Sequence, residues 1–450
     1  MTARVPSLHE HPLRHELAQE VHARPHEELQ RPVRVSHLAV TGGAAEAERA
    51  AITDLCHRVG APVPAPFANY LSVDLGRFRL RWERHSEFST YTFFRIEPAD
   101  TFLRVEPVDT FLRVEPFDDP FASPALAVVP AEWLDGLPGQ VLTALHLAVV
   151  VGDDGELPDL SPWFGGSQPA VGSRVNGGAG AAWTDFRLHE GFGRILVRDS
   201  HLTRGQTGRL VQRLLEIETY RMMALLALPV ARELAPHLER IEAGVAAIVA
   251  ELAHGEGEGE GGGDARVLLG RLTQLAAEAE GLAAETGYRF SAARAYHAIV
   301  HRRIEALREQ RIAGTQTVAE FMERRLAPAM LTCESTAERM EVLSRHLARA
   351  GDLLRTRVDI ALEENNRDLL RSMDRRAHMQ LRLQETVEGL SVVAISYYLL
   401  SLLGYAAKGA HAVGLAVDSD IVKLVGMPLV IALVAISVRR LRRAVGRQQE

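Results

Sequence analysis

The stretch LSVVAISYYLLSLLGYAA, from Leu390 to Ala407, contains no charged side chain. A helix needs ~20 mostly apolar residues to cross the ~30 Å hydrocarbon core of a bilayer, and ~17 residues is about the lower limit. The same composition would also suit a buried core helix of a soluble protein. The choice between the two decides the architecture of the chain, and the flanking sequence favours a membrane span.

A second apolar segment, IVKLVGMPLVIALVAISV, runs from Ile421 to Val438 and carries one charge, Lys423, near its start. Arginines precede the first segment and follow the second, whereas the connection between the two segments contains no arginine. The flanking residues that we expect to set the topology are Arg375, Arg376, Arg439, Arg440, Arg442 and Arg443. Because cytoplasmic flanks carry an excess of basic residues, the sequence predicts a transmembrane hairpin over residues 389–445, with spans at about 390–407 and 421–438 and both termini in the cytoplasm.

Polar side chains recur along one face of the first span. Ser391, Tyr398 and Tyr405 are seven residues apart, so they share a helical face, and Ser401 lies close to them. One interpretation is a seam that packs against the second span or a neighbouring subunit. The other is the lining of a water-filled path.

The bulk composition excludes some classes of function. The chain has 450 residues, enough for two or three domains, and a net charge of -7. A general nucleic-acid-binding protein would carry a strongly basic face, so we expect no nucleic-acid partner. Cys56 and Cys333 are isolated, which predicts a reducing compartment, and the first residues lack the apolar core of a secretory signal.

Residues 201–388 have a helical pattern. We expect helix breaks at Pro229 and Pro236, and a flexible linker over residues 254–265, where the sequence is HGEGEGEGGGDA. The last helix is expected to enter the first span directly. Its apolar residues approximate a coiled-coil seam that Asn365 and Arg376 interrupt, so a helical bundle and a homo-oligomer are both open interpretations.

Residues 1–200 have the pattern of an α+β domain, with helices over one face of a sheet. Alternating and β-branched runs predict strands. These runs are VRVSHLAV (Val33–Val40), NYLSVDLGRFRLRW (Asn69–Trp82), STYTFFRI (Ser89–Ile96), ALAVVP (Ala125–Pro130) and LTALHLAVVV (Leu142–Val151). A hairpin is predicted in WTDFRLHEGFGRILVRD (Trp183–Asp199), and a helix that ends at Gly60 lies between the first two strands.

Few residues suggest chemistry. His11, His15 and His22 would share one face of an N-terminal helix and are candidate metal ligands, and the alternative is a docking helix whose polar groups pair locally. His297 and His301 share a helical face with Glu305 and are a second candidate. No catalytic constellation is evident, and no cofactor is indicated, so the sequence does not identify an enzyme.

Three segments carry a family resemblance: HPLRHELAQEVHARP (His11–Pro25), LVQRLLEIETYRMMALLALP (Leu210–Pro229) and the stretch from Arg355 to Leu399. Together they resemble the bacterial membrane-anchored proteins of domain of unknown function 3422. The resemblance covers nearly the whole chain. It implies a bacterial inner-membrane protein with a large cytosolic part, and it implies no activity.

The architecture is also similar to that of CorA-type magnesium channels, which carry a Gly-Met-Asn signature at the outer end of the first span. The corresponding connection here, GYAAKGAHAVGLAVDSD, lacks that triplet. We therefore expect an α+β cytosolic domain, a long-helix bundle or coiled coil and a two-helix membrane hairpin, serving as a membrane-anchored module that binds a partner or ligand. The alternative is a divalent-cation channel without the signature.

Overall fold

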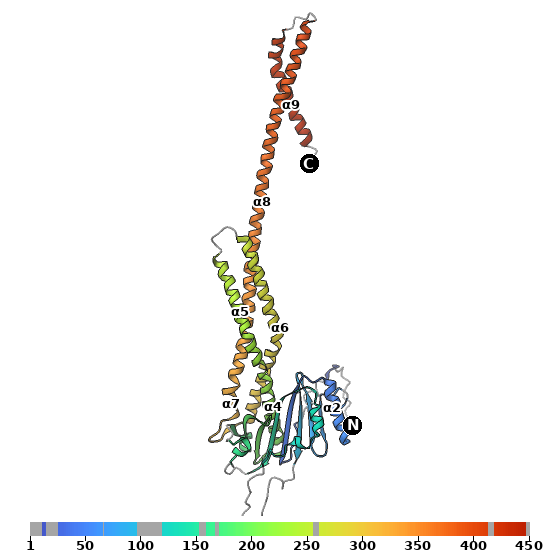
Figure 1. Cartoon of the computed structure of the whole chain (residues 1–450), viewed down its shortest axis with the longest axis vertical. Coiled ribbons are helices and arrows are strands. Elements are labelled where there is room, and N and C mark those ends of the chain that lie inside the picture. The colour runs from blue at the N-terminus through green and yellow to red at the C-terminus, as the bar shows by residue number, and fades with distance from the viewer. Residues whose placement is uncertain are drawn as a thin grey trace, which may run out of the picture. The chain divides into compact units, whose positions relative to one another are not determined.

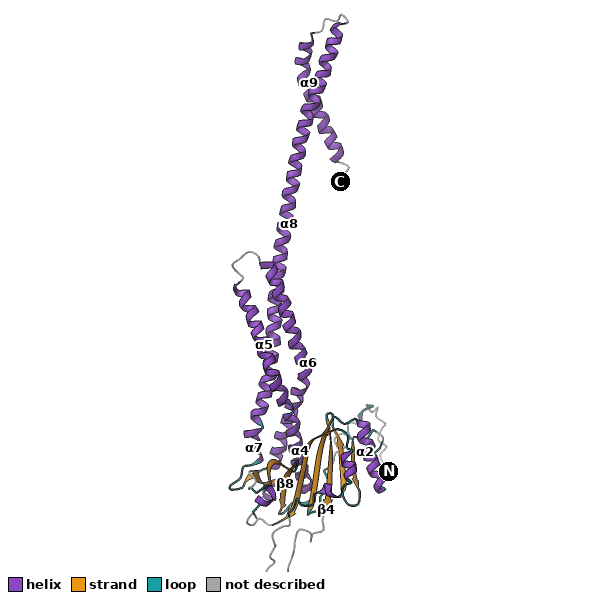
Figure 2. Cartoon of the chain, viewed as in Figure 1, coloured by secondary structure: helices purple, strands orange, loops and turns teal. Residues whose placement is uncertain are grey.

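The computed structural model describes residues 11–14, 26–65, 67–96, 119–152, 159–166, 171–254, 261–412 and 418–446. Nine strands of the described chain form one sheet in the order β2-β3-β4-β1-β5-β8-β7-β6-β9 (Figures 1 and 2). Their bounds are β1 Val33–Thr41, β2 Tyr70–Asp74, β3 Arg79–Arg84, β4 Phe88–Ile96, β5 Gln140–Val151, β6 Val171–Val175, β7 Gly180–His189, β8 Phe192–Asp199 and β9 Gln310–Arg311. Neighbouring strands run antiparallel, except that β5 and β8 run parallel.

Helices cover both faces of this sheet, whereas the sequence predicted cover on one face only. Short helices lie on the first face: α2 (Ala45–Val59), η2 (Ala125–Val128) and α3 (Ala131–Asp135). The core beneath them includes the fully buried Ile52, Leu55, Leu80, Trp82 and Phe93. Successive strand residues point to opposite faces, so His37 and Ala39 of β1 point the other way, towards helix α4 (Arg204–Leu225).

The predicted strand at ALAVVP is wrong, because Pro124 and Pro130 bracket a four-residue 3₁₀-helix there. Two more short 3₁₀-helices, η3 (Ser161–Phe164) and η4 (Asn176–Gly178), lie in connections of the sheet. The helix predicted to end at Gly60 is confirmed: Gly60 has a φ of 69° and closes α2, a left-handed conformation that glycine adopts without steric cost.

The long helices follow the sheet. They are α5 (Ala227–His254), α6 (Gly261–Leu307), α7 (Val318–Arg325), α8 (Ala327–Ala412) and α9 (Ser419–Gly446). Pro229 lies in the first turn of α5, where a missing N–H costs little. Pro236 lies inside α5, so the break predicted there is wrong. Of the predicted linker, residues 261–265 already belong to α6, and residues 255–260 lie outside the described part of the chain.

The contacts divide the chain into two compact units. One consists of residues 1–248 and 272–349, which include the sheet, and the other of residues 249–271 and 350–450. The second unit contains the later part of α8, which we define from Leu362 to Leu390 as the stalk segment, and nearly every residue of it is exposed. It also contains two helical stretches that are long and apolar enough to cross a membrane, at the end of α8 and in α9.

Candidate functional sites

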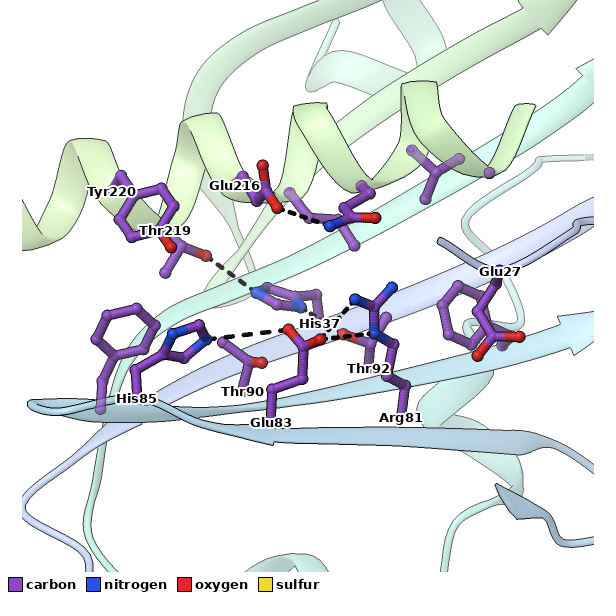
Figure 3. A pocket seen from close by; sticks show the side chains of 16 residues that line it. Glu27, His37, Arg81, Glu83, His85, Thr90, Thr92, Glu216, Thr219 and Tyr220 are labelled. Carbon is purple, nitrogen blue, oxygen red and sulfur yellow. Dashed lines mark hydrogen bonds and ion pairs between the residues drawn. The ribbon is translucent and has the colours of Figure 1, made fainter. Parts of the chain in front are cut away.

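A small cavity lies between the sheet and helix α4 (Figure 3). Charged and hydrogen-bonding side chains line it together with the apolar Phe88, Phe94 and Leu215, and we call it the polar cavity. Side chains from β1, β3 and β4 form one wall, and side chains of α4 form the other. The cavity has a volume of about 40 Å³, which is room for about three water molecules. Its size therefore suits water or a very small polar ligand.

His37 is a buried polar side chain at this cavity. Its Nδ1 lies 2.8 Å from Thr92 Oγ1 on β4, and its Nε2 lies 3.0 Å from Thr219 Oγ1 on α4. A neutral imidazole has one donor and one acceptor, so one hydroxyl donates to the ring and the other accepts from it. Burial, with smaller contributions from Arg81 and His85, lowers the pKa of His37 to about 3. His37 is therefore neutral near pH 7.

A row of titratable side chains runs along one face of β3 and the residue that follows it. Arg81, Glu83 and His85 are two residues apart, and Figure 3 shows Glu83 between the other two. Arg81 Nε donates to Glu83 Oε1 at 3.0 Å, and His85 Nε2 lies 3.9 Å from Glu83 Oε2. The ring of His85 stacks on Phe88 with the centroids 4.4 Å apart.

The other carboxylates at the cavity are also paired. Glu27 accepts hydrogen bonds from Ser72 Oγ and Arg79 Nη1 at 2.5 and 2.9 Å. Glu216 accepts from Gln212 Nε2 at 2.8 Å and forms an ion pair with Arg303. The wall is thus close to charge-balanced, which favours a neutral polar ligand over a bare ion.

The cavity is poorly suited to acid–base catalysis near neutral pH. A catalytic acid or base works best with a pKa close to the operating pH, and the pKa of His37 is far below it. Within the described ranges, no group of three or more His, Cys, Asp or Glu side chains could hold a metal ion. The hydrogen-bonding groups at the cavity could bind a small polar ligand.

The predicted histidine sites are only partly within the described residues. His15 and His22 lie outside them, and His11 accepts a hydrogen bond at Nδ1 from the backbone N–H of Leu13 at 3.2 Å. On α6, His301 Nε2 lies 3.1 Å from His297 Nε2, and desolvation together with the neighbouring imidazole lowers the pKa of His297. The two rings therefore pair with each other.

The polar face predicted on the first apolar helix is largely exposed. Tyr398 and Tyr405 are 69% and 74% exposed. Ser391 Oγ and Ser401 Oγ each donate to a backbone carbonyl one turn earlier, at 2.9 Å. Whether this face packs against another subunit or lines a path stays a prediction.

The neighbouring face of α8 meets α9, and Ser401 lies at its border, because it lines the groove between the two helices. Ser396 is 5% exposed, and Gly404 and Ala407 are also buried. A Cβ built on Gly404 would lie 2.5 Å from Lys423 Cε, so the stem of Lys423 crosses α8 at that glycine. A groove of about 420 Å³ follows between the two helices.

The arginines expected to set the topology lie on the two helices that carry the apolar stretches. Arg375 and Arg376 are exposed on the stalk segment, and Arg439 and Arg440 are exposed near the end of α9. Arg442 and Arg443 also belong to α9, and their side chains are outside the described set.

The family model described as "Protein of unknown function (DUF3422)" matches residues 9–445 of the chain. The chain belongs to the DUF3422 family. The predicted resemblance to DUF3422 is thereby confirmed. No curated protein and no solved structure matches the chain, so membership in DUF3422 identifies the relatives of the chain and not its activity.

The polar cavity was not predicted from the sequence. One signal was present, because Arg81, Glu83 and His85 alternate just where the predicted run Asn69–Trp82 ends, and an extended chain would place them on one face. The facing residue Thr219 is 182 positions away from its partner His37. No local pattern predicts that contact.

Proposed function

We propose that this DUF3422 protein is a membrane-anchored module of the bacterial inner membrane, held by the α8–α9 hairpin, whose cytosolic part binds a ligand or partner. The observation that carries the proposal is the exposure of the two apolar helical stretches. Only 17% and 11% of their most apolar windows are buried. A core helix of a soluble protein would bury most of such a surface.

The charges around the hairpin support one orientation. The exposed arginines lie before the first apolar stretch and after the second. The connection between the stretches has Lys408, Asp418 and Asp420 instead. By the positive-inside tendency, both arginine-rich flanks belong in the cytoplasm and the connection outside.

The polar cavity supports ligand binding as the role of the cytosolic part. It combines neutral hydrogen-bonding groups with paired charges, and its volume of about 40 Å³ limits a fully enclosed ligand to a very small polar molecule. A larger molecule would need α4 to move away from the sheet. An enzyme activity has no support at this cavity.

Two measurements on the full-length chain test the anchoring. We expect the protein to stay in the membrane pellet after alkaline carbonate extraction. A cysteine at Gly409, where added atoms would meet open space, should react with an impermeant maleimide on intact spheroplasts. A cysteine at Gln448 should react only after permeabilisation. Release by carbonate, or the reverse labelling pattern, would overturn the proposal.

A divalent-cation channel is a second candidate, because Tyr398 and Tyr405 lie exposed on one face of the first apolar stretch, where they are free to line a path between copies. Cation flux into proteoliposomes tests it. Flux that disappears with Tyr398→Phe and Tyr405→Phe, or with Asp418→Asn and Asp420→Asn, would favour a channel. Absence of flux, or flux that these variants leave unchanged, would count against a pore at this face.

A further inference from the structure

The stalk segment of α8 leaves a broad apolar face without a partner in the described chain. Seven large apolar side chains within it are between 56% and 72% exposed. They are Leu369, Leu370, Met373, Met379, Leu383, Val387 and Leu390. A soluble helix that stood alone would place charged or polar groups at such positions.

Most charges of this segment lie on the opposite face. With Leu362 taken as a d position, a heptad repeat places a and d residues at 366, 369, 373, 376, 380, 383, 387 and 390. The acidic and basic residues at the outward b, c and f positions are Glu364, Arg367, Asp368, Arg371, Asp374, Arg375, Arg382, Glu385 and Glu388. Within the stalk segment, the only such residues at an a, d, e or g position are Glu363, at e in the first turn, and Arg376, at d. Asn366 and Gln380 are uncharged polar residues at a positions.

We propose that the uncharged face of the stalk segment packs in parallel against the same face of further copies of this chain. A second copy is the occupant that fits, because the face carries almost no charge for a charged partner to recognise. The face also continues into the first apolar stretch of α8. Under the proposed function, this stretch enters the membrane in the same orientation in every copy. Only the parallel orientation of the copies rests on the proposed function.

The breadth of the face indicates more than two helices in the assembly. In a two-stranded coiled coil, charged residues usually occupy the e and g positions and pair between chains. Here the e and g positions from Asn365 to Thr386 are uncharged, and they include Leu370 and Met379. A helix with two neighbours buries such positions on both sides.

Arg376 is the charged residue at a core position, and it gives the assembly a second test. A charge at a core position lowers stability and restricts register. Replacing buried charges with apolar residues of similar volume is often stabilising. Arg376→Leu should therefore tighten the assembly roughly tenfold. The matched variant Arg375→Leu changes the neighbouring c position and should leave assembly unchanged.

Single cysteines in the full-length protein test the packing in native membranes. We expect Met373→Cys and Leu383→Cys to form interchain disulfides on mild oxidation, because identical residues meet in a parallel seam. The outward controls Asp374→Cys and Glu385→Cys should stay monomeric on non-reducing gels. Equal cross-linking of all four variants would overturn the proposal. Absence of cross-linking in all four, together with a monomer on dilution of the detergent-solubilised protein, would also overturn it.

The outcome of the cross-linking experiment can be distinguished from the outcome of the carbonate extraction and maleimide labelling that test the membrane anchor. A protein that cross-links through the seam but is released by carbonate would retain the assembly and lose the anchor. Cross-linking at one position only, near the midpoint of the segment, would indicate antiparallel pairing and would also overturn the inference. Tighter assembly of Arg375→Leu than of Arg376→Leu would contradict the assigned register.

Discussion

His37 Nε2 lies 3.0 Å from Thr219 Oγ1, a contact that joins the middle of the sheet to the helix on its face. Both residues are at least 96% buried. A buried imidazole that holds two hydroxyls fixes the distance between two layers, and it also makes the domain sensitive to the protonation of one ring.

Stability of the sheet domain should fall as the pH falls below 6.5. The folded pKa of His37 is about 3, against 6.5 for the free side chain, so between these values only the unfolded chain takes up the proton. The contribution of His37 to the free energy of unfolding is complete above pH 6.5. Below pH 6.5 it declines by up to about 1.4 kcal/mol per pH unit. The pKa of His146, lowered by burial to about 4, adds in the same direction.

The variant His37→Gln isolates the first contribution, because glutamine keeps a donor and an acceptor and does not titrate. The stability advantage of the wild type over this variant should shrink by about 2 kcal/mol between pH 7 and pH 5. Tryptophan fluorescence during urea unfolding measures it, since Trp82, Trp133, Trp163 and Trp183 are all buried in the sheet domain. A difference that does not change with pH would contradict the prediction.

Gly208→Ala should destabilise the domain by about 1–3 kcal/mol through overpacking. A Cβ at this position of α4 would lie 1.6 Å from the carbonyl oxygen of Glu27, a backbone atom that cannot rotate away. Gly205→Ala is the matched control on the same helix, because its Cβ would meet neighbours at 3.5 Å or more. Thermal melting should separate the two variants. Equal effects would mean that the segment containing Glu27 moves freely.

Asp199→Ala should cost about 1–3 kcal/mol, because Leu202 N and Thr207 Oγ1 lose the buried carboxylate that accepts their hydrogen bonds. The Asp199 side chain is fully buried, pairs with Arg31 and accepts hydrogen bonds from Leu202 N and Thr207 Oγ1, each at 2.9 Å. The control, Asp54→Ala, removes an exposed pair with Arg58 on α2 and should cost about 0.5 kcal/mol or less. Urea unfolding compares them, and similar losses would refute the assignment.

Both cysteines should be unreactive in the native protein. Cys56 and Cys333 are 0% and 2% exposed, and burial raises the pKa of each thiol. Because the thiolate is the reactive form, a maleimide should label neither at pH 7 until the chain unfolds. Mass spectrometry of digests taken along a urea series would follow the two residues separately. Rapid labelling of either residue without urea would contradict the burial seen here.

The strands with long alternating runs could be predicted from the sequence. The runs at Val33, Ser89 and Leu142 correspond to β1, β4 and β5, and the hairpin at Glu190 and Gly191 joins β7 to β8. These elements carry their signal locally, in side-chain alternation and turn residues.

Elements set by distant contacts could not be predicted in this way. β9 consists of Gln310 and Arg311 only and forms because β6 offers an edge. The continuity of α5 through Pro236 depends on packing along the rest of the helix, which buries Leu234, Leu238 and Ile241. The cavity at His37 likewise needs α4, a segment far from β1 in the chain.

The way the sheet is closed has a consequence for synthesis on the ribosome. Ser173 on β6 bonds to Glu309, which lies 136 residues later and directly precedes β9. A nascent chain that has completed β8 therefore exposes β6 as an unpaired edge strand until α5, α6 and β9 have also emerged. Unpaired edge strands pair readily with other chains. Premature termination within α5 or α6 should therefore yield aggregates rather than a small folded fragment.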